Sequence, residues 1–111
     1  MAEDVLRHLQ HALDVCGEDH VGVGTDGTIS PVAVTAEFKK KFADEVNERK
    51  KLGIGAPGED ANVYTFVPDL NAANRFERLA ELLSARRYSQ RQIAKVLGGN
   101  FLRLLREVWA A

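Results

Sequence analysis

The sequence predicts a mostly α-helical chain that contains one helix–turn–strand unit of the α/β kind. Apolar side chains recur at helical spacing over residues 4–16, again after Thr35, and through the C-terminal part from residue 71. The first helical stretch leads directly into a Val-Gly-Val run at residues 21–23, which is typical of a short buried strand. The rest of the chain offers little β-like sequence, so helices dominate the prediction.

Length and composition indicate one soluble domain. The chain has 111 residues, of which 45% are hydrophobic and 28% charged, as in ordinary globular proteins. Its net charge of -1 gives no electrostatic reason to expect nucleic acid or an anionic membrane as a partner. The acidic N-terminus does not look like a secretory signal, and no apolar run approaches the roughly 20 residues that span a bilayer. With a single cysteine, Cys16, we expect a cytoplasmic chain.

The first predicted helix covers residues 4–16. Asp4 is a candidate N-cap, and Gly17 is a candidate stop signal. His8 and His11 lie one turn apart and could in principle chelate a metal ion. They have no obvious third ligand, and the helix face opposite Leu9 and Leu13 should be solvated, so we favour a solvated surface over a metal site.

The stretch from Gly17 to Ser30 has more features of a functional site than any other. Its strand-like residues 21–23 run into a tight turn that presents one carboxylate, Asp26, at the strand end. In α/β proteins, chemistry is usually placed at the carboxyl ends of strands. Asp26 also has a simpler interpretation, in which its side chain only caps the turn. Glycines lie on both sides of Asp26, at positions 22, 24 and 27, and they allow backbone or ligand to approach it closely.

One further β-like run, residues 62–67, is stopped by Pro68. It could pair with residues 21–23, although a two-stranded sheet is marginal by itself. Between these runs, Thr35 opens a second helix, with Phe38, Phe42 and Val46 on its apolar side. The lysines at 39–41 are interleaved with acids further along, which favours a solvated face over a polyanion site. Residues 53–62 contain three glycines and a proline and are predicted as a loop.

The C-terminal third reads as three helices. Ser89 and Gln92 have the spacing of a capping box, and Gly98-Gly99 should end the short helix that follows. Asn100 is the predicted cap of the last helix. The basic residues of this region are spread over three elements and offset by acids, so a DNA-reading module is disfavoured. We expect the large aromatic side chains to pack in the core, namely Phe38, Phe42, Phe76, Phe101 and Trp109.

Two blocks of the chain together resemble a known family. Residues 9–27 read LQHALDVCGEDHVGVGTDG, and residues 79–108 read LAELLSARRYSQRQIAKVLGGNFLRLLREV. In this order they are similar to the C-terminal end of the membrane (renal) dipeptidase family of zinc peptidases. That end has a helix, a Gly-Val/Ile-Gly-x-Asp strand end, an irregular crossing, and a Leu-Gly-Gly-Asn-Phe-Leu-Arg block. The resemblance covers roughly half of the chain and leaves residues 30–70 divergent.

The resemblance implies a (β/α)₈ barrel, of which this chain would be a partial domain over residues 1–111. Residues 1–34 would supply a helix and the last barrel strand, residues 35–70 a divergent helix and loop, and residues 71–111 the C-terminal helices. Asp26 would bind the dipeptide near the bridging water and take part in proton transfer, with Gly27 beside it in the substrate site. Most family members have Asp-Phe-Asp-Gly here, whereas this chain lacks the second acid.

The family's catalytic site holds two zinc ions, and their ligands come from earlier strands of the barrel. This sequence has no His-x-Asp motif, and its histidines lie at positions 8, 11 and 20. A barrel of this type needs about 250 residues. We therefore expect the chain to be a piece of the fold that binds no zinc and hydrolyses no dipeptide alone.

Two functional hypotheses follow. In the first, the chain is the C-terminal part of a metallopeptidase of the dipeptidase kind, complete only with the missing part of the barrel. In the second, it is a non-catalytic helical fragment, a structural or interaction module whose helices bury their apolar faces against each other or against a second copy of the chain. Both hypotheses lead us to expect association, either as a homo-oligomer or with the remainder of a barrel.

Overall fold

The first helix, α1, spans Ala2–Cys16 in the computed structural model, which describes residues 1–109. It begins two residues before the predicted cap, so Asp4 lies in its first turn rather than at the cap. There the Asp4 carboxylate accepts hydrogen bonds from the N-terminal ammonium, at 3.0 Å, and from Arg7, at 2.7 Å. A carboxylate in this position also interacts favourably with the positive end of the helix dipole. Gly17 ends the helix with a φ of 79°, as predicted.

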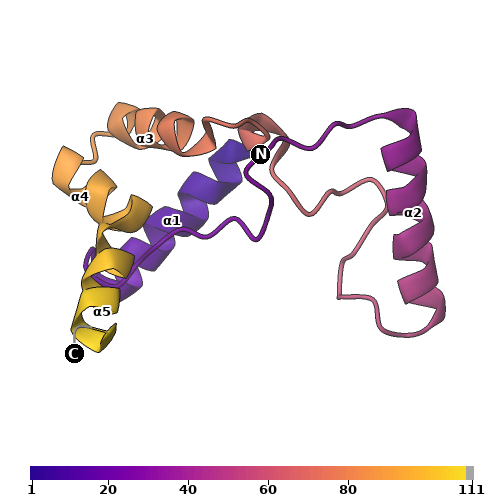
Figure 1. The fold of residues 1–111 in the computed structure, drawn as a ribbon, viewed down its shortest axis with the longest axis horizontal. Coiled ribbons are helices and arrows are strands. Elements are labelled where there is room, and N and C mark those ends of the chain that lie inside the picture. Colours follow the sequence, from indigo (N-terminus) through magenta and orange to yellow (C-terminus); the bar gives the residue numbers. More distant parts are fainter. Residues whose placement is uncertain (110–111) are drawn as a thin grey trace.

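Helix α2 spans Ala36–Lys51 and begins where the sequence predicts. The Thr35 hydroxyl accepts a hydrogen bond from the backbone of Phe38 at 3.1 Å, which is a standard N-cap. In Figure 1, α2 stands apart from the other helices and is joined to them by two extended connections. The predicted loop at residues 53–62 contains no regular element and folds back beside α2.

A small aromatic cluster holds this outlying part together. The rings of Phe38 and Phe42 on α2 contact Tyr64, with centroids 5.8 and 5.4 Å away, and Tyr64 stacks on Phe66 at 5.1 Å. Pairs at these distances contribute about 0.5–1.5 kcal/mol beyond the area that they bury. Residues 62–67 therefore pack against α2 with their side chains instead of pairing as a strand.

The C-terminal part contains the 3₁₀ turn η1 (Pro68–Leu70), α3 (Arg75–Ala85), α4 (Gln90–Ala94), the π-helical turn η2 (Lys95–Gly99) and α5 (Asn100–Trp109). The capping box predicted at α4 is present, because Ser89 accepts from the Gln92 backbone and the Gln92 side chain accepts from the Ser89 backbone. The predicted stop at Gly98-Gly99 is a kink. Gly98 has a non-helical φ of 157°, and the chain then turns directly into α5.

The main core lies between α1, α3, α4 and η2, which gather on one side of Figure 1. It is built from the apolar stripe of each amphipathic helix, so each helix buries the face that its sequence period predicts. Val21, from the connection after α1, is buried in the same cluster. The buried members are Leu6, Leu9, Val21, Leu79, Leu83, Ile93 and Val96.

Among residues 1–109 there is no β-strand, so the strand predicted at residues 21–23 is not formed. Val21 is buried as expected, but a strand needs a neighbour to pair with its backbone. The other candidate, residues 62–67, is engaged with α2. The chain as described is thus mostly α-helical, which confirms the coarser part of the fold prediction.

The prediction of core packing for the aromatic residues is only partly right. Phe42 is buried and Phe38 is half-buried, but Phe76, Phe101 and Trp109 are exposed, the last by 75%. Two of these three residues, Phe101 and Trp109, lie on helix α5. It touches the core near Asn100 and then runs outward, so its apolar side chains are only partly covered within residues 1–109.

The molecule is extended for its length. Its radius of gyration is 16.9 Å, whereas a compact domain of this length has about 13 Å. Its accessible surface is 8205 Å², against about 6,100 Å² for a compact monomer of this mass. The chain therefore exposes more surface than a compact monomer of its mass does. No helix within residues 1–109 has the length and apolar character that crossing a bilayer requires.

Candidate functional site

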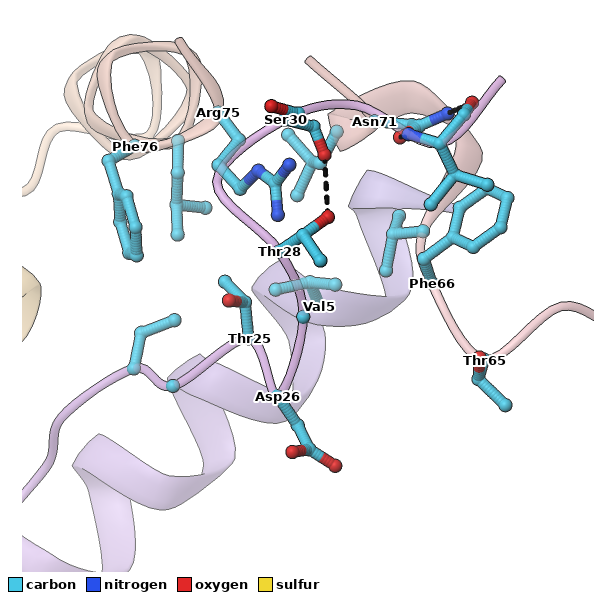
Figure 2. Close-up of a pocket in the computed structure, with 17 residues that line it drawn as sticks. Val5, Thr25, Asp26, Thr28, Ser30, Thr65, Phe66, Asn71, Arg75 and Phe76 are labelled. Atoms are coloured by element: carbon cyan, nitrogen blue, oxygen red, sulfur yellow. Dashed lines mark hydrogen bonds between the residues drawn. The ribbon is translucent and has the colours of Figure 1, made fainter. Parts of the chain in front are cut away.

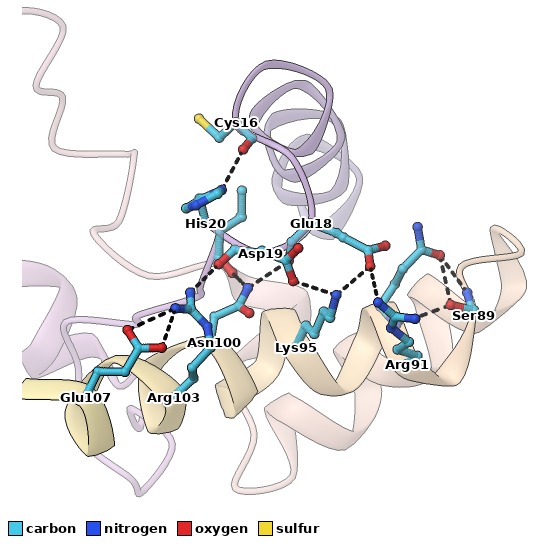
Figure 3. Close-up of polar contacts among 12 residues, drawn as sticks. Cys16, Glu18, Asp19, His20, Ser89, Arg91, Lys95, Asn100, Arg103 and Glu107 are labelled. Carbon is cyan, nitrogen blue, oxygen red and sulfur yellow. Dashed lines mark hydrogen bonds and ion pairs between the residues drawn. The ribbon is translucent and has the colours of Figure 1, made fainter. Parts of the chain in front are cut away.

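The segment between α1 and α2 carries the predicted site, and a group of polar contacts fixes its first residues. Asn100, at the start of α5, is buried, and its side-chain amide donates hydrogen bonds to the carbonyls of Glu18 and Val21, each at 2.8 Å (Figure 3). Arg103, one turn further on, donates to the carbonyl of Asp19 at 2.8 Å. The role predicted for Asn100, capping its own helix, is therefore wrong, because its side chain binds a segment about 80 residues earlier.

Lys95 adds charge to this attachment. Its ammonium lies 2.5 Å from carboxylate oxygens of both Glu18 and Asp19 (Figure 3). The hydrogen bond from Lys95 lowers the pKa of both carboxyl groups, and their hydrogen bonds, first that of Asp19, raise the pKa of Lys95. We call the contacts of Lys95, Asn100 and Arg103 with residues 18–21 the polar clamp.

Two backbone features complete the attachment. The Val23 amide donates to the Val96 carbonyl at 3.3 Å. At Gly22, an added Cβ would lie only 2.4 Å from the ring of Phe101. Glycine therefore allows the ring to lie directly on the backbone there. Residues 18–23 are thus bound to η2 and α5 along their length.

Beyond Val23 the chain forms one wall of a cavity of about 350 Å³ (Figure 2). Asn71 holds this wall from the far side, since its amide donates to the Val32 carbonyl at 2.8 Å and its oxygen accepts from the Val32 amide at 2.7 Å. Arg75, at the start of α3, lines the cavity and donates to the Ile29 carbonyl at 3.3 Å. We call this cavity the Arg75 pocket. Its lining comprises residues 5, 23–28, 30, 32, 65–67, 70, 71, 75, 76 and 79.

Asp26 lies at the edge of the Arg75 pocket. Its backbone has a φ of 45°, in the left-handed region that Asp tolerates better than most residues. The side chain is exposed, and Figure 2 shows the carboxylate pointing away from Arg75 and Thr28. No hydrogen bond to this carboxylate is formed within residues 1–109, so the alternative in which Asp26 caps its own turn finds no support in the contacts. Gly27, the other predicted site residue, also lines the pocket.

The histidines do not form a metal site. His8 and His11 are exposed on α1, and the His20 ring lies with Nδ1 3.0 Å from the Cys16 carbonyl. Nowhere in the described part of the chain do three or more His, Cys, Asp or Glu side chains converge to hold a metal ion. The residues present here therefore do not fit a zinc centre by themselves.

Sequence reasoning missed the two residues that shape this region most. Arg75 gave no signal, because an arginine in the first turn of an amphipathic helix looks like ordinary surface. Asn100 was noticed, but only as a helix cap. Both act through partners more than 45 residues away, which no local pattern reveals.

Comparisons of this chain with protein-family models, with curated proteins and with solved structures find no match.

Replacing Asn100 tests the polar clamp. Asn100→Ala leaves the Glu18 and Val21 carbonyls without their donor, so we expect the free energy of unfolding to fall by about 2 kcal/mol. Urea denaturation followed by circular dichroism measures it. Asn47→Ala, on the exposed surface of α2, is the control and should change stability by no more than about 0.5 kcal/mol. Equal losses in the two variants would contradict the clamp.

The charges of the clamp predict a pH dependence. Folding lowers the pKa of Glu18 and Asp19 below their ordinary values of 4.5 and 3.8. Their contribution to stability is therefore present above these values and lost as the pH falls through the lowered ones. Lys95→Met should reduce stability at neutral pH and flatten its decline below pH 5, measured by urea denaturation at several pH values.

The control for this experiment is Lys40→Met. Lys40 pairs with Asp44 at 2.6 Å on the solvated face of α2, where both side chains are exposed. Its removal should leave the acid dependence of stability as in the parent chain. If Lys95→Met shows the same decline with falling pH as the parent, the assignment of that decline to Glu18 and Asp19 is wrong.

Proposed function

We propose that this chain is the C-terminal part of a metal-dependent dipeptidase-like hydrolase, of (β/α)₈ descent, in which Asp26 is the carboxylate that binds substrate and transfers a proton. The observation that carries the proposal is a contact between the two blocks that resemble the dipeptidase family. Asn100 and Lys95, from the second block, bind residues 18–21 of the first block. The divergent residues in between largely stand apart with α2.

The position of Asp26 suits a carboxylate that binds substrate. It lies on a tight turn with a glycine on either side, at 24 and 27, so a ligand can approach the carboxylate without meeting neighbouring side chains. An exposed carboxylate in this position can hold a substrate ammonium by a charge-assisted hydrogen bond. It can equally accept a proton from an attacking water, as a general base does within hydrogen-bond reach.

The remainder of the catalytic site must come from other polypeptide. Residues 1–109 bring together no cluster of three or more zinc-ligating side chains, so the proposal assigns to this chain the positioning of Asp26 and the shaping of the substrate pocket. The large surface left uncovered by its helices is consistent with such an arrangement. This is why we expect the isolated chain to have no peptidase activity.

A chimera tests the proposal. Residues 1–111 replace the corresponding C-terminal segment of a dipeptidase of the resembled family, and hydrolysis of a dipeptide is measured. We expect the zinc-loaded chimera to be active, and Asp26→Asn to lower kcat by about a hundredfold or more, because general acid–base groups contribute at this level.

Asp14→Asn is the matched control, since Asp14 is an exposed carboxylate on α1 that does not line the Arg75 pocket. It should leave the activity of the chimera unchanged. Zinc content and circular dichroism establish that each protein is folded and loaded. A folded, loaded chimera in which Asp26→Asn is as active as its parent would overturn the role of Asp26.

A specific observation favours a second candidate function, self-association through α5. Six apolar side chains form a continuous stripe along this helix, and each of them is at least 40% exposed. Polar residues, among them the ion pair of Arg103 and Glu107, occupy the opposite face. The stripe consists of Phe101, Leu102, Leu104, Leu105, Val108 and Trp109.

The stripe leaves room for a dimer contact. Its six side chains are 40–75% exposed. A stable interface buries about 1,200–2,000 Å² in total, so two such stripes would have to pack face to face along the whole helix. Self-association and the hydrolase proposal differ in what covers α5: a second copy, or the rest of a barrel.

Sedimentation at two concentrations separates these possibilities for the chain alone. We expect the mass to rise with concentration, and Leu105→Glu, in the stripe, to keep the chain monomeric, because a buried unpaired charge opposes association. Arg106→Glu changes the opposite face and should behave as the parent chain. A monomer at every concentration, or equal effects of the two variants, would exclude self-association through α5.

A further inference from the structure

The Arg75 pocket is a largely apolar cavity with a single cation in its wall. Its volume of about 350 Å³ lies near the lower end of the range of small-molecule sites, roughly 300–1,000 Å³. The wall comes from α1, α3, η1 and the two connections that lead to and from α2. Its apolar side chains include Val5, Val23, Phe66, Val67, Leu70 and Leu79. All of these except Leu79 are only half-buried, so apolar surface in the wall is left uncovered.

The backbone around Arg75 holds its guanidinium at this wall. Nε donates to the Ala72 carbonyl at 3.0 Å, and Nη2 donates to the Ile29 carbonyl at 3.3 Å. Nη1 lies beside the turn, since a Cβ added to Gly27 would be 3.8 Å from it. Figure 2 shows the guanidinium extending from α3 towards Thr28. These contacts are all with neutral groups, so they fix the position of the cation without neutralising it.

The guanidinium keeps its charge and most of its donors for a ligand. Of its five N–H groups, two make the bonds just described. Over residues 1–109, no carboxylate forms an ion pair with Arg75, although four other arginines have acidic partners. A half-buried cation with free N–H groups beside uncovered apolar surface favours an anion that has an apolar body.

The charges around the cavity favour a singly charged ligand that carries no ammonium group. Arg75 is the one cation among the lining residues, and Asp26 is the one acid. A dianion such as a phosphate monoester would therefore keep a charge that nothing in the wall compensates. Because the Asp26 carboxylate points away from Arg75 (Figure 2), an ammonium group on the ligand would find no carboxylate beside it in the cavity.

We propose that the Arg75 pocket binds a short-chain aliphatic carboxylate such as hexanoate, with the carboxylate on Arg75 and the alkyl chain against the apolar wall. This inference goes beyond the proposed function and does not depend on it, since the Asp26 carboxylate lies outside the cavity and takes no part in binding. The alkyl chain covers the sides of the wall that the protein itself leaves uncovered.

Nuclear magnetic resonance titration of the ¹⁵N-labelled chain at pH 7 tests the proposal with four probes. These are hexanoate, hexan-1-ol, butanoate and hexyl phosphate. We expect hexanoate to shift the amide signals of residues 24–30, 66–71 and 75–79, which surround the cavity. Hexan-1-ol lacks the anion and butanoate lacks two methylenes, so each should bind about tenfold more weakly. Hexyl phosphate should also bind more weakly than hexanoate, because of its second charge.

Arg75→Gln separates the effect of charge from that of shape. The ratio of hexanoate affinity to hexan-1-ol affinity should fall from about ten to about one in this variant. Arg78→Gln, on the exposed surface of the same helix, should leave the ratio unchanged. The ratio stays informative if Arg75→Gln loosens the 29–30 backbone, because loosening weakens both ligands alike. If the variant does not fold, the four probes on the parent chain decide the question.

Several outcomes would overturn the proposal. They are the absence of shifts, equal binding of hexanoate and hexan-1-ol, equal binding of hexanoate and butanoate, tighter binding of hexyl phosphate, and an unchanged ratio in Arg75→Gln. Shifts confined to residues 101–109 would do the same, because they place the alkyl chain on the exposed stripe of α5 instead. All of these measurements use the chain alone without zinc, so their result is independent of the activity of the chimera.

Discussion

The amide of Asn100 is the contact on which the arrangement of the whole site depends. The segment after α1 has an extended, strand-like sequence but no neighbouring strand to satisfy its backbone. Asn100 replaces part of that missing neighbour, because its two N–H groups bind the carbonyls of Glu18 and Val21. The charges of Lys95 and Arg103 reinforce this attachment from the same helical stretch. Residues 18–21 are held in this way. The chain that leaves them forms the turn at Asp26 and one wall of the Arg75 pocket.

The helices of this chain are packed to different extents. The helices α1, α3 and α4 cover one another, whereas α5 is anchored at Asn100 and then projects with its apolar stripe exposed. Helix α2 and its aromatic cluster form a second, smaller packing unit at the other end of the molecule. The Arg75 pocket lies where the two units meet, and Phe66 belongs to both the cluster and the pocket lining. The apolar stripe of α5 and the Arg75 pocket lie on different elements.

Local signals were the most reliable guide to the fold. The cap at Thr35, the capping box at Ser89 and the stop at Gly17 are all present, because each involves residues within four positions of one another. The prediction at residues 21–23 was wrong as a strand, since pairing needs a distant partner, and of the three residues only Val21 is buried. Trp109 was expected in the core because large aromatic residues are usually covered. What covers them depends on the neighbours available, and Trp109 at the end of α5 is left 75% exposed.

The sequence by itself determined where the helices lie, which face of each is apolar, and that Asp26 stands on a glycine-flanked turn. Periodicity, capping and glycine conformational freedom are properties of residues close together in the chain, so they can be read without coordinates. Only the tertiary structure decided that Asn100 and Lys95 bind residues 18–21, that the Asp26 carboxylate points away from Arg75, and that Arg75 lines a cavity. These relations join residues 46 to 82 positions apart, and their geometry depends on how the helices pack.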